Sequence, residues 1–520
     1  MFEKFFSNRF LVLYFTPFII GSISTLSFQP FNFTIINFII FPIIFSLIVL
    51  INKKSKGTYR KKPHKQNFFL FGLSFGFGFY LSGISWITNS LTFDDNFRIL
   101  IPFALILIPL FLSLFMAITI LLIGPHLKLN FTSILIFSSS IAFSDYLRAK
   151  ILSGFPWNLW AYSFSWSNEA LQILNKIDLY AYNLMVITLF VSPITIFYKI
   201  NFAKKLFSTL LITAAVLGVY IYGNLEINKN KKNLNLLKNK ILVKVISPNF
   251  NLNYDLSLNQ IEKRLKKLIR YSEPNKDEKT LFIWPEGVFS GYSYSEILIF
   301  KDLISKSFSD KHFIIFGTNK LDNKIGGYYN SMLLVNNNLE IVQSYYKRKL
   351  VPFGEFLPFE KLFNYFGFKK ITEGHGSFLQ GKKGNNLLLE ELNILPLICY
   401  EAIFTDLIQK SNKDTNLIVN ISEDGWFGNS IGPDQHFAKS IFRAVENNTF
   451  FLRSTNKGVS AIIDNKGSVI KQLNRYEAGN IEFRVPLIKS NKTKNDLIFF
   501  ILLITYLLIF LIYKKKNEKQ

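Results

Sequence analysis

The chain has 520 residues, which is too many for one ordinary domain, so two or more structural units are expected. Apolar residues make up 49% of the sequence and include 56 phenylalanines, a composition that favours membrane-spanning segments beside a soluble part. A net charge of +25 suits nucleic acid or an anionic membrane surface, but the basic residues lie at the ends of apolar runs, which favours the membrane and argues against nucleic acid. The single cysteine excludes an internal disulfide, and five histidines without ligand spacing argue against zinc, so neither a metal nor a cofactor is expected.

Eight apolar runs predict eight transmembrane helices, seven of them within residues 1–223. Each run is long enough, at ~1.5 Å per residue, to cross or nearly cross a hydrocarbon core of ~30 Å. The first run is too long for a cleavable signal peptide and continues directly into the second. The predicted spans lie near residues 9–27, 30–51, 67–88, 99–124, 131–148, 179–198, 206–223 and 497–513.

Basic residues mark one side of these spans. They precede the first span, as Lys4 and Arg9, and they recur after the second span, after the sixth and in the C-terminal tail. With eight spans all four segments fall on one side, which the positive-inside rule assigns to the cytoplasm. Both termini are therefore expected in the cytoplasm, and residues 224–496 on the opposite side.

The end of the fifth span carries an acid and a base. Asp145 and Arg148 are three residues apart, so they share a helix face and could pair. An aromatic-rich loop that contains Gly154 and Trp157 follows, and its composition is typical of an anchor at the membrane interface.

Residues 224–239 are basic and rich in asparagine, and they predict a linker. Residues 240–490 alternate short apolar strands with amphipathic helices, a pattern that predicts a mixed α/β sandwich long enough to have its own core. Strands are expected at 241–246, 280–284, 313–317, 329–336, 339–346, 394–399, 416–422, 449–455, 458–464 and 468–473, and helices near 256–272, 294–308 and 434–447.

Three of these strands are followed by a group that can do chemistry. Glu286, Lys347 and Cys399 each come directly after a strand, and sites in α/β sheets gather beyond the carboxyl ends of strands. A carboxylate can take the thiol proton, an ammonium can stabilise a thiolate and then an oxyanion, and a thiolate can attack a carbonyl carbon. A lone cysteine is more often an inert small side chain, so the interpretation depends on all three residues meeting.

These three residues resemble the Glu-Lys-Cys triad of the nitrilase superfamily. Together with the membrane half, the chain resembles the apolipoprotein N-acyltransferase family of bacterial inner membranes over nearly its whole length. The most specific matching stretches are 350–358, 398–401, 424–428, 432–437, 452–458, 145–148 and 154–157. The chain departs from the family at Asp145, where Glu is more frequent, and at Glu423, where Asn is usual.

The resemblance implies a multi-domain membrane protein, with eight transmembrane helices and a nitrilase-like α/β domain (an αββα sandwich) in the periplasm. It also implies a two-step reaction: Cys399 takes an acyl chain from a membrane phospholipid and passes it to the N-terminal amine of a diacylated apolipoprotein. Glu286 would be the general base, and Lys347 with the backbone N–H of Tyr400 would stabilise the oxyanion. Glu355 and Glu401 would support Lys347. The candidates for substrate binding are Trp426, Phe356 and Gly154.

Several interpretations stay open at this point. Residues 356–368, which are aromatic and precede glycines at 374, 376, 381 and 384, fit either a mobile arm that enters the membrane or an ordinary packing element. His436 is expected to be structural, and Arg453 to pair with a carboxylate inside the domain. A monomer is expected. The alternative functions are a membrane-anchored nitrilase-type amidase that uses water, and a transporter or structural membrane protein, for which more charge pairs inside the spans would be expected.

Overall fold

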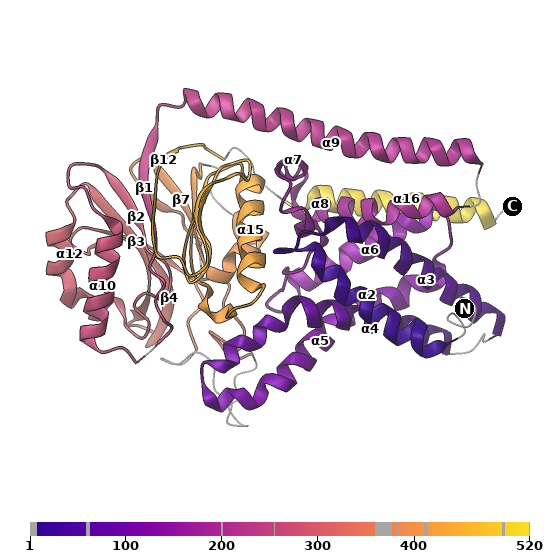
Figure 1. Ribbon diagram of the computed structural model, residues 1–520, viewed down its shortest axis with the longest axis horizontal. Coiled ribbons are helices and arrows are strands. Elements are labelled where there is room, and N and C mark those ends of the chain that lie inside the picture. Colours follow the sequence, from indigo (N-terminus) through magenta and orange to yellow (C-terminus); the bar gives the residue numbers. More distant parts are fainter. Residues whose placement is uncertain are drawn as a thin grey trace. The chain divides into compact units, whose positions relative to one another are not determined.

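The computed structural model describes residues 8–58, 63–198, 201–253, 255–358, 377–382, 384–409, 414–490 and 495–518. The chain divides into two compact units (Figure 1). Unit 1 comprises Met1–Leu225 and Asn495–Gln520, and unit 2 comprises Glu226–Lys494.

Unit 1 is built of apolar helices. Long apolar runs are expected to form helices, because a helix satisfies its own backbone polar groups and can therefore lie in lipid. A short π-helical turn, Leu11–Phe15, leads into the first of these helices. The helices are α2 (Thr16–Ser24), α3 (Asn37–Thr58), α4 (Pro63–Ile84), α5 (Ile101–Ile123), α6 (Phe131–Lys150), α7 (Asn168–Leu171), α8 (Leu174–Val191), α9 (Phe202–Leu236, which continues into unit 2) and α16 (Leu497–Glu518).

Six helical stretches among the described residues are long and apolar enough to cross a membrane. They are Thr34–Lys53, Lys65–Thr92, Asp95–His126, Leu174–Phe197, Lys205–Leu236 and Leu497–Lys515. Two of the eight predicted spans are not among them: the first corresponds to a shorter apolar helix, Leu11–Ser27, and the fifth corresponds to α6, which carries Asp145, Arg148 and Lys150. The count of eight spans therefore remains a prediction.

Most of the predicted linker at 224–239 is helical. α9 continues without a break from its apolar part to Leu236, and β1 begins at Lys240. Residues 224–239 include no Pro and no Gly, the residues that most often end a helix, so the helix can continue through this run.

The acid–base pair predicted at the end of the fifth span is confirmed. Arg148 Nη2 lies 2.9 Å from Asp145 Oδ1, and Asn183 Nδ2 donates to Asp145 Oδ2 at 3.0 Å. The composition of the loop that follows indicated an anchor at the membrane interface. In the structure, part of this loop packs inside unit 1 instead of being exposed. Trp157 is fully buried, and its ring centroid lies 4.6 Å from that of Trp86.

Unit 2 contains two six-stranded sheets, with the strand orders β12-β1-β2-β3-β4-β5 and β11-β10-β9-β8-β7-β6. The central strands β1–β2–β3 and β7–β8–β9 run parallel. The strands are β1 (Lys240–Ser247), β2 (Thr280–Ile283), β3 (His312–Asp322), β4 (Gly327–Asn336), β5 (Ile341–Tyr346), β6 (Leu387–Leu389), β7 (Leu392–Ile398), β8 (Leu417–Glu423), β9 (Phe451–Asn456), β10 (Ser460–Ile463), β11 (Val469–Leu473) and β12 (Gly479–Pro486).

Helices cover the outer face of each sheet, so unit 2 has the α/β sandwich architecture that the sequence predicted (Figure 1). α10 (Leu258–Ser272) and α12 (Lys301–Ser307) pack on the first sheet through a core that includes Leu265, Trp284 and Phe316. α15 (Gly432–Asn447) packs beside the second sheet, and two short helices, α11 (Tyr294–Ile297) and α14 (Thr405–Gln409), complete the unit. The sequence did not predict β6 and β12, which are edge strands.

Candidate active site

The thiol of Cys399 lies where β7 ends and a short 3₁₀ helix, Cys399–Ile403, begins. The residue has a φ of +49°, in the left-handed region that a side chain with a Cβ rarely adopts. It is buried, with 9% of its surface exposed. A strained and buried residue at the end of a strand is held in place by its surroundings, and such residues gather at active sites.

A lysine between two carboxylates forms the centre of the site. Lys347 Nζ lies 2.8 Å from Glu355 Oε1 and 3.5 Å from Glu286 Oε1, and its side chain is 1% exposed. Asn330 Nδ2 donates to both carboxylates, at 2.8 Å to Glu286 Oε1 and at 2.8 Å to Glu355 Oε1. The four side chains therefore form one hydrogen-bonded cluster: Glu286 follows β2, Asn330 lies within β4, and Lys347 and Glu355 follow β5.

Electrostatics connect this cluster to the thiol. Burial and the Glu286 carboxylate raise the pKa of Cys399, while Lys347 acts to lower it. Burial alone would lower the pKa of Lys347, but Glu286 and Glu355 outweigh it and raise that pKa overall. At neutral pH the site therefore holds a protonated thiol beside an ammonium ion, and a base must remove the thiol proton before attack.

Glu401 supports the site through the backbone. Its buried carboxylate accepts from the backbone N–H groups of Arg348 at 2.7 Å, Lys349 at 3.1 Å and Ile398 at 2.8 Å. The Tyr345 hydroxyl also donates to it, at 2.9 Å. Glu401 thus ties the end of β7 to the residues on either side of Lys347. Burial raises the pKa of Glu401, and these hydrogen bonds oppose that rise.

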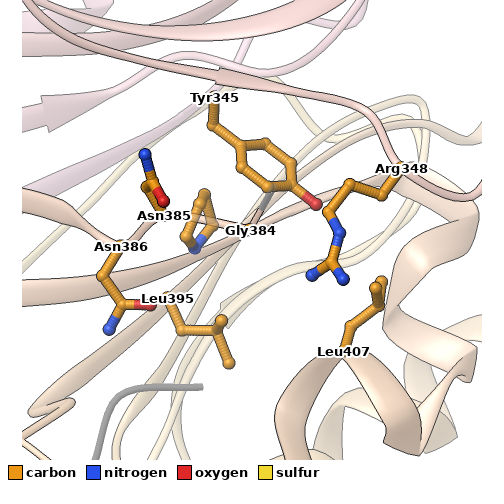
Figure 2. A pocket seen from close by; sticks show the side chains of 8 residues that line it. Tyr345, Arg348, Gly384, Asn385, Asn386, Leu395 and Leu407 are labelled. Atoms are coloured by element: carbon orange, nitrogen blue, oxygen red, sulfur yellow. The ribbon is translucent and has the colours of Figure 1, made fainter. Parts of the chain in front are cut away.

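A cavity of about 10 Å³ lies next to these residues, and Tyr345, Arg348, Gly384, Asn385, Asn386, Leu395, Pro396 and Leu407 line it (Figure 2). That volume suits a single water molecule. A larger groove of about 590 Å³ follows β5, lined by Tyr329, Tyr346 and Lys382 among others. Neither hollow is lined by Cys399, so neither defines the place of an acyl chain.

The remaining predicted site residues lie in different places. Tyr400 follows Cys399 and packs edge-on against Phe404, with 5.0 Å between ring centroids. Trp426 is half-buried in the turn after β8, and Phe356 is half-buried beside Glu355. Gly154, with a φ of +76°, belongs to unit 1.

Most of the predicted aromatic arm at 356–368, namely residues 359–368, lies outside the described residues. The chain after it is tied to the site by backbone hydrogen bonds. Phe378 N donates to the Glu355 carbonyl, and Gly381 N donates to the Lys347 carbonyl, both at 2.8 Å. A Cβ on Gly381 would lie 2.2 Å from the Tyr346 carbonyl oxygen, so only glycine permits this close approach.

Sequence reasoning missed Asn330, which bridges the two carboxylates. It lies within β4, in a run of strand-forming residues that gave no sign of function. The one signal was a polar residue at a position that β pairing buries: Asn330 is 8% exposed. The expected partner of Arg453 was found, because its Nη2 lies 2.8 Å from Asp424 Oδ2.

Glu423, which departs from the resembled pattern, lies against the carboxylate of Glu286. Its backbone N–H donates to Glu286 Oε2 at 3.2 Å, and its own carboxyl accepts from Gly425 N at 2.8 Å and from Asn456 Nδ2 at 2.7 Å. Burial raises the pKa of Glu423 to about 8, and the nearby carboxylates of Glu286 and Asp424 contribute to the rise.

A two-sheet α/β sandwich that presents a cysteine, a lysine and glutamates at its strand ends is the architecture of a carbon–nitrogen hydrolase. The sequence model of the carbon–nitrogen hydrolase family matches residues 254–494, and that of the apolipoprotein N-acyltransferase N-terminal domain matches residues 20–192. The chain belongs to the apolipoprotein N-acyltransferase family.

Curated relatives carry this family name. The chain is 30% identical over 481 residues to the apolipoprotein N-acyltransferase of Rhodopseudomonas palustris, a match that covers 90% of this chain and 88% of the relative. It is 32% identical over 479 residues to that of Rickettsia typhi, covering 90% and 91%. The solved structure of Saccharomyces cerevisiae Nit3, a member of branch 10 of the nitrilase superfamily, aligns with 48% of this chain and 91% of its own at a TM-score of 0.36 and 15% identity.

Proposed function

We propose that the chain is a phospholipid-dependent N-acyltransferase that completes lipoprotein maturation. It moves a fatty acyl chain from a membrane phospholipid, through a thioester on Cys399, to the N-terminal amine of a diacylglyceryl-modified apolipoprotein. The carrying observation is the Lys347 ammonium held at 2.8 Å from Glu355 and 3.5 Å from Glu286, beside the only thiol of the chain. The names of the relatives support the acceptor.

In the first step Glu286 takes the proton of the Cys399 thiol, and the thiolate attacks the ester carbonyl of the phospholipid. A carbon–sulfur bond forms, and the oxyanion is stabilised by Lys347 and the backbone N–H of Tyr400. The ester carbon–oxygen bond then breaks. The lysophospholipid oxygen takes the proton from Glu286 and leaves, so the enzyme carries an acyl thioester.

In the second step the free amine of the apolipoprotein attacks the thioester carbonyl. The carbon–nitrogen bond forms, Glu286 accepts a proton from the nitrogen, and the same two donors stabilise the second oxyanion. The carbon–sulfur bond breaks, and the thiolate takes the proton back from Glu286. The product is an amide, and the enzyme returns to its starting state.

The geometry assigns different work to the two glutamates. Glu355 makes the shorter contact with Lys347, accepts from Val351 N at 2.9 Å, and is 9% exposed in its side chain. Glu286 makes the longer contact and is 14% exposed. These contacts support Glu355 as the residue that holds the ammonium in place and Glu286 as the general base.

The membrane unit has a physical role in this scheme. Both substrates carry acyl chains that water does not hold, and an enzyme anchored in lipid lets the chains stay there while the ester or amine reaches the sulfur. We place the enzyme in the inner membrane as a monomer, with eight spans, cytoplasmic termini and a periplasmic catalytic domain. Trp426, Phe356 and Gly154 remain the candidates for contact with the substrates.

The test uses the purified full chain with phosphatidylethanolamine and a diacylated lipopeptide, followed by mass analysis of peptide and protein. The proposal expects one added acyl group on the peptide, and an acyl adduct on Cys399 when the peptide is omitted. Free fatty acid with an unchanged peptide would instead indicate an amidase-type enzyme that uses water. Normal transfer by Cys399→Ser would remove the thiol from the reaction.

A further inference from the structure

The carbonyl of Cys399 and the N–H of Tyr400 belong to the same peptide group, and two side chains hold its carbonyl end. His436 Nε2 lies 3.2 Å from the Cys399 oxygen, and Asn420 Nδ2 donates to that oxygen at 3.4 Å. His436 belongs to α15 and Asn420 to β8, so two separate elements hold the Cys399 carbonyl oxygen in place. In a planar trans peptide the C=O and N–H bonds point in opposite directions. A carbonyl fixed on the core side therefore turns the Tyr400 N–H the other way.

The contacts of the His436 ring define which nitrogen donates. Nδ1 lies 3.0 Å from Arg453 Nη2, which can only donate, so Nδ1 acts as an acceptor and Nε2 carries the hydrogen that faces the Cys399 oxygen. Nδ1 also lies 3.1 Å from Asp424 Oδ1, which accepts from Ser422 Oγ at 2.7 Å and has a further lone pair, so this contact taken alone favours the opposite tautomer. The opposite tautomer would face the Cys399 oxygen with a lone pair and Arg453 with a second hydrogen. Burial and the Arg453 guanidinium lower the pKa of His436 to about 4, so the ring is uncharged at neutral pH.

The guanidinium of Arg453 contacts both Asn420 and His436, the two side chains that donate to the Cys399 oxygen. Arg453 donates to Asn420 Oδ1 through Nη1, and through Nη2 it contacts Asp424 Oδ2 and His436 Nδ1. Arg453, Asn420 and His436 are each 0% exposed. Hydrogen bonds within a buried network hold its members in place, and hydrogen bonds in series polarise the groups they join. A hydrogen bond to the carbonyl of a peptide also makes its N–H a stronger donor.

We propose that His436, with Asn420 beside it, is a positioning residue for the oxyanion site: it holds the Cys399–Tyr400 peptide so that the Tyr400 N–H faces the reacting carbonyl oxygen. This rests on the proposed function, in which Cys399 is the nucleophile. It also explains why Cys399 keeps its strained φ of +49°. His436 touches neither substrate nor sulfur in this scheme, and it acts through the peptide alone.

The experiment separates a reaction that needs the oxyanion site from one that does not. The rate of acyl adduct formation on Cys399 is measured in a single turnover with phosphatidylethanolamine in detergent micelles. The rate of alkylation of the same thiol by iodoacetamide is measured in parallel, because displacement at a CH₂ carbon creates no oxyanion. His436→Asn places its amide near Nδ1 and loses the donor at Nε2, whereas His436→Gln keeps a donor near Nε2.

For His436→Asn we expect acylation to fall roughly tenfold or more, less than the ~10²–10³ lost with an oxyanion donor itself, while alkylation stays within about twofold. His436→Gln should restore most of the acylation rate. Asn420→Ser, which removes the second donor, should show the same separation and serves if His436→Asn does not fold. Unchanged acylation, or an equal loss of acylation and alkylation, would overturn the proposal. If Cys399 gains no acyl adduct even in the unaltered chain, the proposed function fails instead.

Discussion

Lys347 Nζ lies 2.8 Å from Glu355 Oε1, and this buried contact ties the one ammonium of the site to a carboxylate that is itself anchored to backbone at Val351. Glu286, the second carboxylate, shares Asn330 with Glu355 and lies farther from the amine. Under the proposed mechanism Glu355 holds the ammonium in place and Glu286 serves as the base. The behaviour of the cluster on substitution should follow this division.

Lys347→Met should lower acyl transfer at least 100-fold, because one oxyanion donor is worth about 10²–10³ and the thiolate loses its nearest cation. Two carboxylates are then left buried together, so the melting temperature should also fall. The matched control is Lys244→Met, which removes another buried lysine of unit 2, paired with Glu482 at 3.0 Å. The control should transfer acyl groups normally. Transfer by Lys347→Met within tenfold of the unaltered chain would contradict the assignment.

Asn330→Asp should slow acyl adduct formation roughly 10- to 100-fold. The amide donates to Glu286 and Glu355 at once, and an unmet buried polar group is worth ~1–3 kcal/mol. The aspartate also places a third carboxylate beside the first two. Asn336→Asp, at the turn end of the same strand, is the matched control. Equal single-turnover rates for the two variants would show that Asn330 has no part in ordering the carboxylates.

The raised pKa of Glu423 should make the free energy of unfolding depend on pH. Its pKa is about 8 in the folded chain against 4.5 ordinarily, so between these values the folded state holds a proton that the unfolded state has released. The contribution is fully present below about pH 4.5, declines as pH rises, and is lost once pH passes about 8. It is on the order of 5 kcal/mol, from 1.36 kcal/mol per pKa unit over the rise from 4.5 to about 8.

Glu423→Gln keeps the shape of the side chain without the titration. The difference in melting temperature between the unaltered chain and this variant should shift steadily from pH 5 to pH 9, in favour of the variant at high pH. Parallel melting curves across that range would mean that Glu423 does not take up a proton on folding.

Two aspartate–arginine pairs in unit 1 offer a direct comparison of buried and exposed charge. Asp145–Arg148 and Asp95–Arg98 have the same spacing and lengths of 2.9 and 3.0 Å, but their side chains are 6% and 1% exposed in the first pair and 87% and 61% in the second. Breaking a buried pair from one side typically costs about 3–5 kcal/mol, while exposed pairs contribute little. Arg148→Met should lower the melting temperature in detergent clearly, and Arg98→Met should hardly change it. Similar decreases in melting temperature for both variants would contradict a larger contribution from the buried pair.

The strand ends were predictable because alternating and continuous apolar runs mark strands, and each reactive residue comes just beyond such a run. The Asp145–Arg148 pair followed from helical spacing alone. The role of Glu401 was less accessible, since it supports Lys347 through backbone N–H groups, and no side-chain pattern records such contacts. The role of Asn330 could not be predicted for a related reason. Only the folded chain shows that β4 places it within hydrogen-bonding distance of Glu286 and Glu355. The helical form of the linker was not predicted, because its polar composition drew attention away from the absence of Pro and Gly, without which a helix can continue.

The burial of Cys399 at 9% exposure, in a chain with no other cysteine, has a practical consequence. Any electrophile that attaches through sulfur marks a single known position, so an unmodified protein already serves as a single-label sample. Chain length of a captured lipid, turnover of the adduct and its removal by an amine can each be followed as mass changes on one atom, without first engineering away a background.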